Sequence, residues 1–411
     1  MSVVWKKLVF SEDAVTPAQW NQNGFENQTD SVISFTDATR TFQITPAVTS
    51  FSYYVAGVQY TKTAAEDIVI SNDEGVHVIY YDGGTLSEAV NPTSSQVDSV
   101  IRTKAIVSII YWDASEAEAI YVGEERHGKE MSPSTHSFLH FTQGLAYLSG
   151  IGLNTMSVDG NGSSDAHAQF GIDSGGVTDE DLYHAIDAVA AATGLPIYYM
   201  LGADSEWQKE IVSGFSVKNY SGGDGRLAYN QWTGAAWQLT EVAEADYVLC
   251  HVFATTEKDT PMIAIVGQAD YTKVSDARAG AKTEILSLVT NDVLFPEIRP
   301  IATVIFKTDK DYANAVKAAI VSTDDGESYV DWRNESVSRT VVSTTDHGAL
   351  SGLDADDHPQ YLLRTEAHYT PLSLGEDYTI PTGEAFLAAD EIEIESSYTL
   401  TIEGTGRMIL Q

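Results

Sequence analysis

Three histidines lie close together in this sequence and are the first candidates for metal chemistry. His136 and His140 are four residues apart, and His127 lies shortly before them. On a helix, residues four apart share one face, a geometry in which two imidazoles can bind one zinc ion. However, Ser132-Pro133-Ser134 offers no helical context, and the His-Glu-x-x-His pattern is absent. We therefore expect these to be ordinary polar or packing histidines.

A second candidate for metal binding is a short polar segment with oxygen-bearing side chains at alternate positions: Asp159, Asn161, Ser163 and Asp165. This alternation resembles the start of a calcium-binding loop. The sixth position is Ser164 instead of glycine, and the twelfth is Phe170 instead of a bidentate glutamate. We favour a polar turn with side-chain-to-backbone hydrogen bonds and keep structural calcium as the alternative.

Nucleophilic catalysis has little support. Asp165-Ala166-His167 is an acid–histidine pair near Ser163, but no Gly-x-Ser-x-Gly turn accompanies it. The single cysteine, Cys250, lies in the apolar run 247–253, next to His251. Neighbours in a strand point to opposite faces, so these two side chains should not meet. We predict a buried inert thiol, no catalytic residue and no enzymatic activity.

Several aromatic residues surround the glycine-rich stretch 221–235. They are Trp207, Tyr220, Tyr229, Trp232 and Trp237. Aromatic faces beside polar loops can stack on sugars, so a glycan-binding surface is one interpretation. Packing in the core of a β-rich domain is the interpretation that we favour.

Composition limits the partners. Acidic residues outnumber basic ones 59 to 23, which gives a formal net charge of −36. Such a chain repels nucleic acid and anionic membranes, so we expect neither as a partner. The sequence lacks a signal-peptide pattern and any apolar run of about 18 residues that could span a bilayer. We therefore expect synthesis in the cytoplasm and no membrane insertion.

The elements that would position these side chains are mostly strands. Residues 31–130 contain short β-branched and aromatic runs bounded by turn signals, which predicts an antiparallel sandwich-like domain. Residues 131–337 predict an α+β body with two helices, 178–192 and 275–288, and a hairpin region at 221–239. The body strands are predicted at 196–201, 247–253, 262–266 and 301–306.

Residues 371–411 repeat alternating apolar positions, which predicts short strands. About forty residues in such strands cannot bury enough apolar area to be stable alone, and no disulfide is available to help. We therefore predict a homotrimer in which three copies intertwine to close a core. The residues expected there are Ile392, Ile394, Leu400 and Ile402.

A distinctive segment precedes this element. Residues 346–362 read Asp-His-Gly-Ala-Leu-Ser-Gly-Leu-Asp-Ala-Asp-Asp-His-Pro-Gln-Tyr-Leu. The segment resembles a linker that recurs in tail fibres and other virion fibre proteins of tailed bacteriophages. Leu374, Asp377, Ile380, Pro381 and Gly383 also resemble a strand module at the C-termini of such fibres. Residues 35–333, with 121–128 as one cue, are similar to the body that precedes the linker in related virion proteins.

The resemblance implies a role and assigns parts to the chain. It implies an N-terminal virion-attachment segment at 1–30, a linker at 338–370 and a C-terminal trimerisation module. Interchain contacts are then expected from the linker residues His347, Leu350, Gly352, Leu353, His358, Pro359, Tyr361 and Leu362. Three copies of His347 and His358 on a threefold axis could bind a metal, although turn capping is the simpler interpretation. No other cofactor is expected.

The expected function is that of a homotrimeric fibre protein of the virion, made in the host bacterium. A tail fibre that adsorbs to a host glycan or surface protein is the leading interpretation. A head, neck, collar or baseplate fibre that contacts only other virion proteins is one alternative. A tailspike that cleaves polysaccharide with paired carboxylates is a second alternative.

Overall fold

The computed structural model describes residues 22–288, 297–335 and most positions between 373 and 410. The described residues up to 335 belong to one compact unit, and those from 373 onward belong to a second. Each unit is mainly β, and three α-helices lie in the first. The predicted fold class, β-rich with an α+β body and antiparallel sheets, is confirmed.

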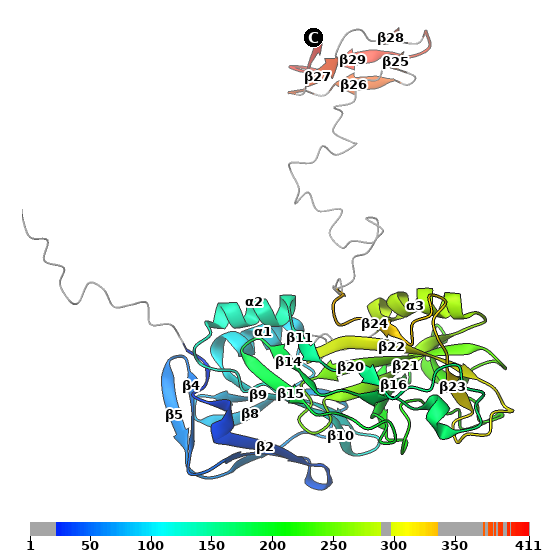
Figure 1. The fold of residues 1–411 in the computed structure, drawn as a ribbon. Helices are drawn as coiled ribbons and strands as arrows, with labels where there is room; N and C mark the ends of the chain where they lie inside the picture. Colours follow the sequence, from blue (N-terminus) through cyan, green and yellow to red (C-terminus); the bar gives the residue numbers. More distant parts are fainter. Residues whose placement is uncertain are drawn as a thin grey trace, which may run out of the picture. The chain divides into compact units, whose positions relative to one another are not determined.

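The first part of the body, residues 24–124, holds three antiparallel sheets and one helix (Figure 1). Their strand orders are β1-β4-β5, β2-β3-β6 and β10-β9-β7-β8. The bounds are β1 Gly24–Phe25, β2 Ser31–Thr36, β3 Thr41–Pro46, β4 Phe51–Val55, β5 Val58–Lys62, β6 Glu66–Val69, β7 Gly75–Asp82, β8 Thr85–Val90, α1 Ser94–Thr103, β9 Ala105–Asp113 and β10 Glu118–Glu124. Short 3-10 turns lie at Gln28–Asp30 and Asp37–Thr39.

Strand β9 is the centre of this part because every residue in it is buried. One face packs against the aromatic core that includes Phe42, Tyr53 and Trp112. The other face, with Ile106 and Ile109, packs under α1. A capping box between Thr93 and Gln96 starts α1, a helix that the sequence analysis did not predict.

The second part of the body is built on a seven-stranded sheet. Its order is β17-β16-β21-β20-β22-β23, with β24 also paired to β22, and among these pairs only β16 and β21 run parallel. The bounds are β16 Ile197–Leu201, β17 Glu206–Glu210, β20 Tyr247–Thr255, β21 Met262–Tyr271, β22 Ile298–Thr308, β23 Ala318–Ile320 and β24 Val330–Asp331. Helix α3, Val274–Ser287, covers one face of this sheet, which confirms the predicted helix at 275–288 (Figure 1).

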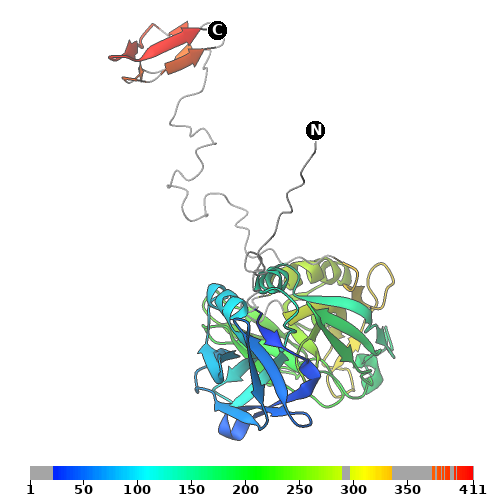
Figure 2. The same cartoon turned by 90° about the vertical axis from the view of Figure 1, so that its left-hand side faces the viewer.

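Smaller elements surround the large sheet. Helix α2, Pro133–Thr142, lies beside α1 (Figures 1 and 2). The remaining elements are β11 Leu145–Gly150, β12 Leu153–Asn154, a 3-10 turn at Asp165–Ala168, β13 Gly171–Ile172, β14 Gly175–Asp179, β15 Leu182–Ile186, β18 Ala228–Trp232 and β19 Trp237–Glu241. Strands β18 and β19 form the predicted hairpin.

The predicted helix at 178–192 is wrong, because β14 and β15 form an antiparallel hairpin there. Leu182 and Ile186 are both buried, as expected for one helix face. However, residues four apart also share one face of a strand, so this spacing fits either structure. The chain reverses at Glu180, which has a left-handed φ of 42°.

The C-terminal unit is a two-coil arrangement of parallel strands. Strands of the first coil, β25 Ser373–Leu374, β26 Tyr378–Ile380 and β27 Ala385–Ala388, pair in order with strands of the second coil, β28 Glu393–Ile394, β29 Leu400–Ile402 and β30 Arg407–Leu410. Asp377 joins the coils by accepting hydrogen bonds from the backbone N–H and hydroxyl of Thr399 at 2.8 and 2.9 Å.

Candidate metal centre

Helix α2 carries two histidines into the protein interior. Ser132 caps its N-terminus and Pro133 occupies the first turn, so the Ser-Pro pair starts a helix and does not prevent one. The expectation that His136 and His140 lack a helical context is therefore wrong. Both histidines are buried, whereas Phe138, between them, is 64% exposed. A helix that buries imidazoles and exposes a phenyl ring reverses the usual amphipathic pattern.

The segment after β10 supplies two more buried side chains, those of Glu125 and His127. The Nδ1 atom of His127 lies 2.8 Å from an oxygen of Asp181. This contact leaves Nε2 directed to the interior without a hydrogen-bond partner. Arg126, which lies between Glu125 and His127 in the sequence, points away from these two side chains. It forms an ion pair with Glu124 and a hydrogen bond with the hydroxyl of Ser31.

The β14–β15 turn and the start of β22 complete the cluster with carboxylates. Asp179 ends β14, and Glu180 occupies the turn itself. Glu297 immediately precedes β22. The side chains of all three are fully buried, and none of their carboxylate oxygens has a hydrogen-bond partner.

The distances within this centre are longer than hydrogen bonds. The Nε2 atom of His127 lies 3.3, 3.5 and 3.6 Å from carboxylate oxygens of Glu180, Glu125 and Asp179, respectively. The Nδ1 atom of His140 lies 3.3 Å from an oxygen of Glu297 and 3.8 Å from one of Glu180. We call these seven residues the carboxylate–histidine cluster: Glu125, His127, His136, His140, Asp179, Glu180 and Glu297.

Burial shifts the protonation of the carboxylates strongly. It raises the pKa of Glu125 to about 7. Burial and the charge of Asp179 together raise the pKa of Glu180 to about 10 and that of Glu297 well above its ordinary value. Ionised carboxylates that lie close together in a dry interior repel one another. The protein alone therefore favours the protonated, neutral form of these carboxylates.

The histidines divide into two kinds. Burial lowers the pKa of His140 to about 4 and also lowers the pKa of His136. Burial alone would lower the pKa of His127 too, but its contacts with Asp181 and Glu125 raise it. Neutral imidazoles offer a free lone pair, which is the form that binds metal ions.

In the segment 159–165, the side-chain oxygens of Asp159, Asn161 and Asp165 accept hydrogen bonds from protein groups. Asp159 accepts hydrogen bonds from the backbone and hydroxyl of Ser322, at 2.9 and 2.8 Å. Asn161 accepts one from the hydroxyl of Ser163 at 2.6 Å, and Asp165 accepts one from the backbone of Ala315. These hydrogen bonds, each to a different partner, are of the kind found in polar turns.

The aromatic candidates separate into core and surface residues. Trp207, Tyr229 and Trp237 are buried, whereas Trp232 is 45% exposed. The rings of Trp232 and Trp237 lie 5.5 Å apart. Together with Tyr229 they line an open cavity of about 360 Å³, whose other lining residues are Gln231, Gln268, Ala269 and Asp270. Tyr220 is half-buried and does not line that cavity.

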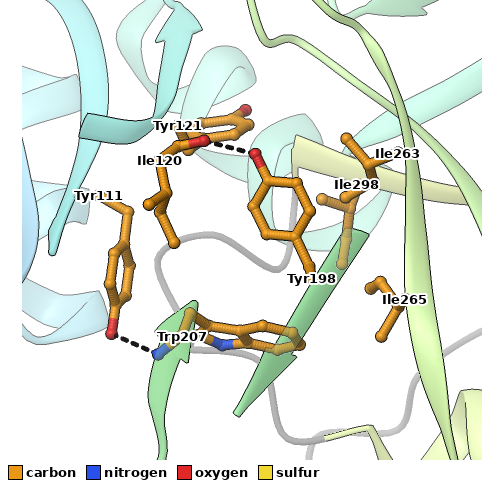
Figure 3. A pocket seen from close by; sticks show the side chains of 8 residues that line it. All are labelled: Tyr111, Ile120, Tyr121, Tyr198, Trp207, Ile263, Ile265 and Ile298. Carbon is orange, nitrogen blue, oxygen red and sulfur yellow. Dashed lines mark hydrogen bonds between the residues drawn. The ribbon is translucent and has the colours of Figure 1, made fainter. Parts of the chain in front are cut away.

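A second cavity, of about 40 Å³, lies between the two parts of the body (Figure 3). It is lined by Tyr111, Ile120, Tyr121, Tyr198, Trp207, Ile263, Ile265 and Ile298. The hydroxyls of its three tyrosines are all bonded to protein groups, including Tyr198 to the carbonyl of Ile120. Ligand sites usually exceed about 300 Å³, so this cavity is a packing gap and not a substrate pocket.

Cys250 and His251 point to opposite faces of β20, as predicted. The thiol of Cys250 is buried in the core and donates to the carbonyl of Ser216. His251 lies on the other face, with Nε2 2.9 Å from an oxygen of Glu284.

The predicted linker residues 346–362 and Ile392 lie outside the residues that the structure describes. For Ile394 only the strand is described, whereas Leu400 is half-buried and Ile402 is exposed.

No protein family, curated protein or solved structure matches this chain. Among the described helices, none is both long and apolar enough to cross a bilayer.

Proposed function

We propose that this chain is a structural fibre protein of a tailed-bacteriophage virion, without enzymatic activity. The observation that carries the proposal is the segment 346–362, whose sequence resembles the phage fibre linker. In the sequence it lies after the described body, which ends at residue 335, and before the C-terminal strands, which begin at residue 373, as the resemblance implies.

The C-terminal unit supports assembly as a homotrimer. Among its residues with described side chains, Ile380 is the one buried hydrophobic residue, with Tyr378 and Leu400 packed on it. Two coils leave both ends of a parallel stack open, and such stacks need about three or more repeats to be stable. Further copies of the chain would supply the missing contacts.

A tail fibre that contacts the host surface is the form of this function that we favour. The support is the open cavity beside Trp232 and Trp237, where aromatic faces lie next to the polar groups of Gln231, Gln268 and Asp270. Stacking faces beside amide and carboxylate groups suit a sugar ligand. A fibre of the head, neck or baseplate would not need this surface for adsorption, whereas a polysaccharide-cleaving tailspike would also bind a glycan.

Three measurements test the proposal. Mass photometry of the full chain should give three times the mass of one chain, and a stable monomer would contradict the fibre assembly. Gold labelling of residues 100–330 on intact virions should mark the distal tail. Label on the head or neck would assign the chain to a decoration or collar fibre. Release of reducing sugar from host polysaccharide would favour the tailspike.

A further inference from the structure

We propose that the carboxylate–histidine cluster binds two divalent first-row transition-metal ions as a structural centre. One ion is assigned to His127, His136 and Glu180, and the other to Glu125, His140 and Glu297. In each of these groups, one ligand atom per residue lies within 4.8 Å of the others. Asp179 is placed to serve both ions, since it groups with Glu125 and His127.

The spacing of the ligand atoms supports metal ions instead of a hydrogen-bond network. Tetrahedral ligands at about 2.0–2.2 Å from an ion are separated by about 3.3–3.6 Å from one another. His127 and Glu180 are separated by 3.3 Å, as are His140 and Glu297. These pairs form no hydrogen bond, and their atoms are buried without any other partner.

The number of charges supports two ions. Four buried carboxylates, those of Glu125, Asp179, Glu180 and Glu297, carry a formal charge of −4 when ionised. Two divalent cations neutralise this charge. Without cations, burial disfavours the ionised form of these carboxylates.

The ligand types indicate which ions fit. Calcium and magnesium prefer all-oxygen sites, whereas imidazole nitrogen mixed with carboxylate suits zinc, manganese, iron and similar ions. The hydrogen bond from His127 to Asp181 is the carboxylate–histidine arrangement that orients imidazole ligands in metal sites. The inward direction of His136 and His140 on α2, despite exposed Phe138, is explained by the same role.

The role that we assign to the ions is structural: they cross-link separate segments of the body. The ligands come from four separate segments: the residues after β10, helix α2, the end of β14 with the turn that follows it, and the residue before β22. All seven side chains are buried, and a closed set of protein ligands is typical of structural metal sites. With one cysteine, the chain has no internal disulfide to join these segments.

The first experiment measures metal content in the purified full-length chain by inductively coupled plasma mass spectrometry. The expected result is two equivalents of transition metal per chain. Less than half an equivalent, both as purified and after refolding in zinc, manganese or iron(II), would overturn the proposal. One equivalent in every condition would overturn the assignment of two ions.

Variants test the location of the ions. Glu180→Gln keeps the side-chain shape and His136→Ala removes a ligand, so both should lose at least one equivalent. The control replaces Glu244, Asp309 and Asp311, an acidic group with two exposed members and one half-buried member, with Gln, Asn and Asn. Loss of metal in the control, or its full retention in both cluster variants, would contradict the site.

If a variant fails to fold, cobalt-refolded wild-type protein should still show visible absorption bands from tetrahedral Co²⁺ with nitrogen ligands, and their absence would contradict the site.

Discussion

An imidazole nitrogen of His140 lies 3.3 Å from a carboxylate oxygen of Glu297, with both side chains fully buried and no hydrogen bond joining them. His140 lies in α2, and Glu297 immediately precedes the long strand β22. A contact of this kind is unfavourable by itself, because each atom loses water and gains no partner. It becomes favourable when both atoms bind the same cation.

Removal of metal should lower the thermal stability of the body. A ligand present at about a hundred times its dissociation constant stabilises a protein by about 2.7 kcal/mol, so two ions at that saturation would contribute about 5 kcal/mol. For a body of this size the expected fall in Tm is on the order of 10 °C. Circular dichroism melts with and without chelator measure it, and a chelator already saturated with zinc is the control. Equal melting temperatures would count against a structural role.

Asp181→Asn should weaken metal binding without abolishing it. Asp181 contacts His127 and not the ions, and loss of such a supporting carboxylate typically costs 10–100-fold in affinity. Competition with a chromogenic chelator measures this change. The matched control is Asp173→Asn, which removes an acid outside the cluster. An unchanged affinity in Asp181→Asn would show that Asp181 does not support His127 in this way.

The thiol of Cys250 should resist labelling in the folded protein. Burial raises its pKa to about 12, so almost no thiolate exists at neutral pH. Ellman's reagent should react at one equivalent per chain in denaturant and more than a hundredfold more slowly without it. Rapid reaction of the native protein would mean that the core around β20 opens readily.

Trp232 and Trp237 should differ in what their loss disturbs. Trp237 is buried, so Trp237→Ala should destabilise the body by about 3–5 kcal/mol. Trp232 is 45% exposed, so Trp232→Ala should cost about 1 kcal/mol or less. If the cavity binds host glycan, Trp232→Ala should nevertheless reduce virion adsorption at least tenfold. Unchanged adsorption would remove the cavity as a receptor site.

Ile380→Asp should dissociate the oligomer while the body stays folded. Ile380 is buried under Tyr378 and Leu400, and a charge there has no partner. Mass photometry should show a shift from trimer to monomer, with an unchanged body melting transition. The control is Val48→Asp, because Val48 lies in the body and is 89% exposed. A trimer that survives Ile380→Asp would place the trimer contacts elsewhere.

Local sequence signals explain some of the predictions that failed. Ser132-Pro133 is a strong start signal for a helix. A helix that begins there places His136 and His140 on the same helix face. Thr93 and Gln96 form a capping box that marks α1. The hairpin at 175–186 is different, because its apolar spacing fits both a helix and a strand, and only its packing decides between them.

By itself, the sequence determined the β-rich fold class, the negative net charge, the burial of the cysteine and the positions of the main body strands. These follow from composition and from the period of apolar residues, which act over a few neighbours along the chain. The tertiary structure alone decided that residues as far apart as Glu125, His140, Glu180 and Glu297 share one buried volume. Metal ligands are selected by proximity in space, and no local pattern in the sequence records which distant carboxylate will meet a given histidine.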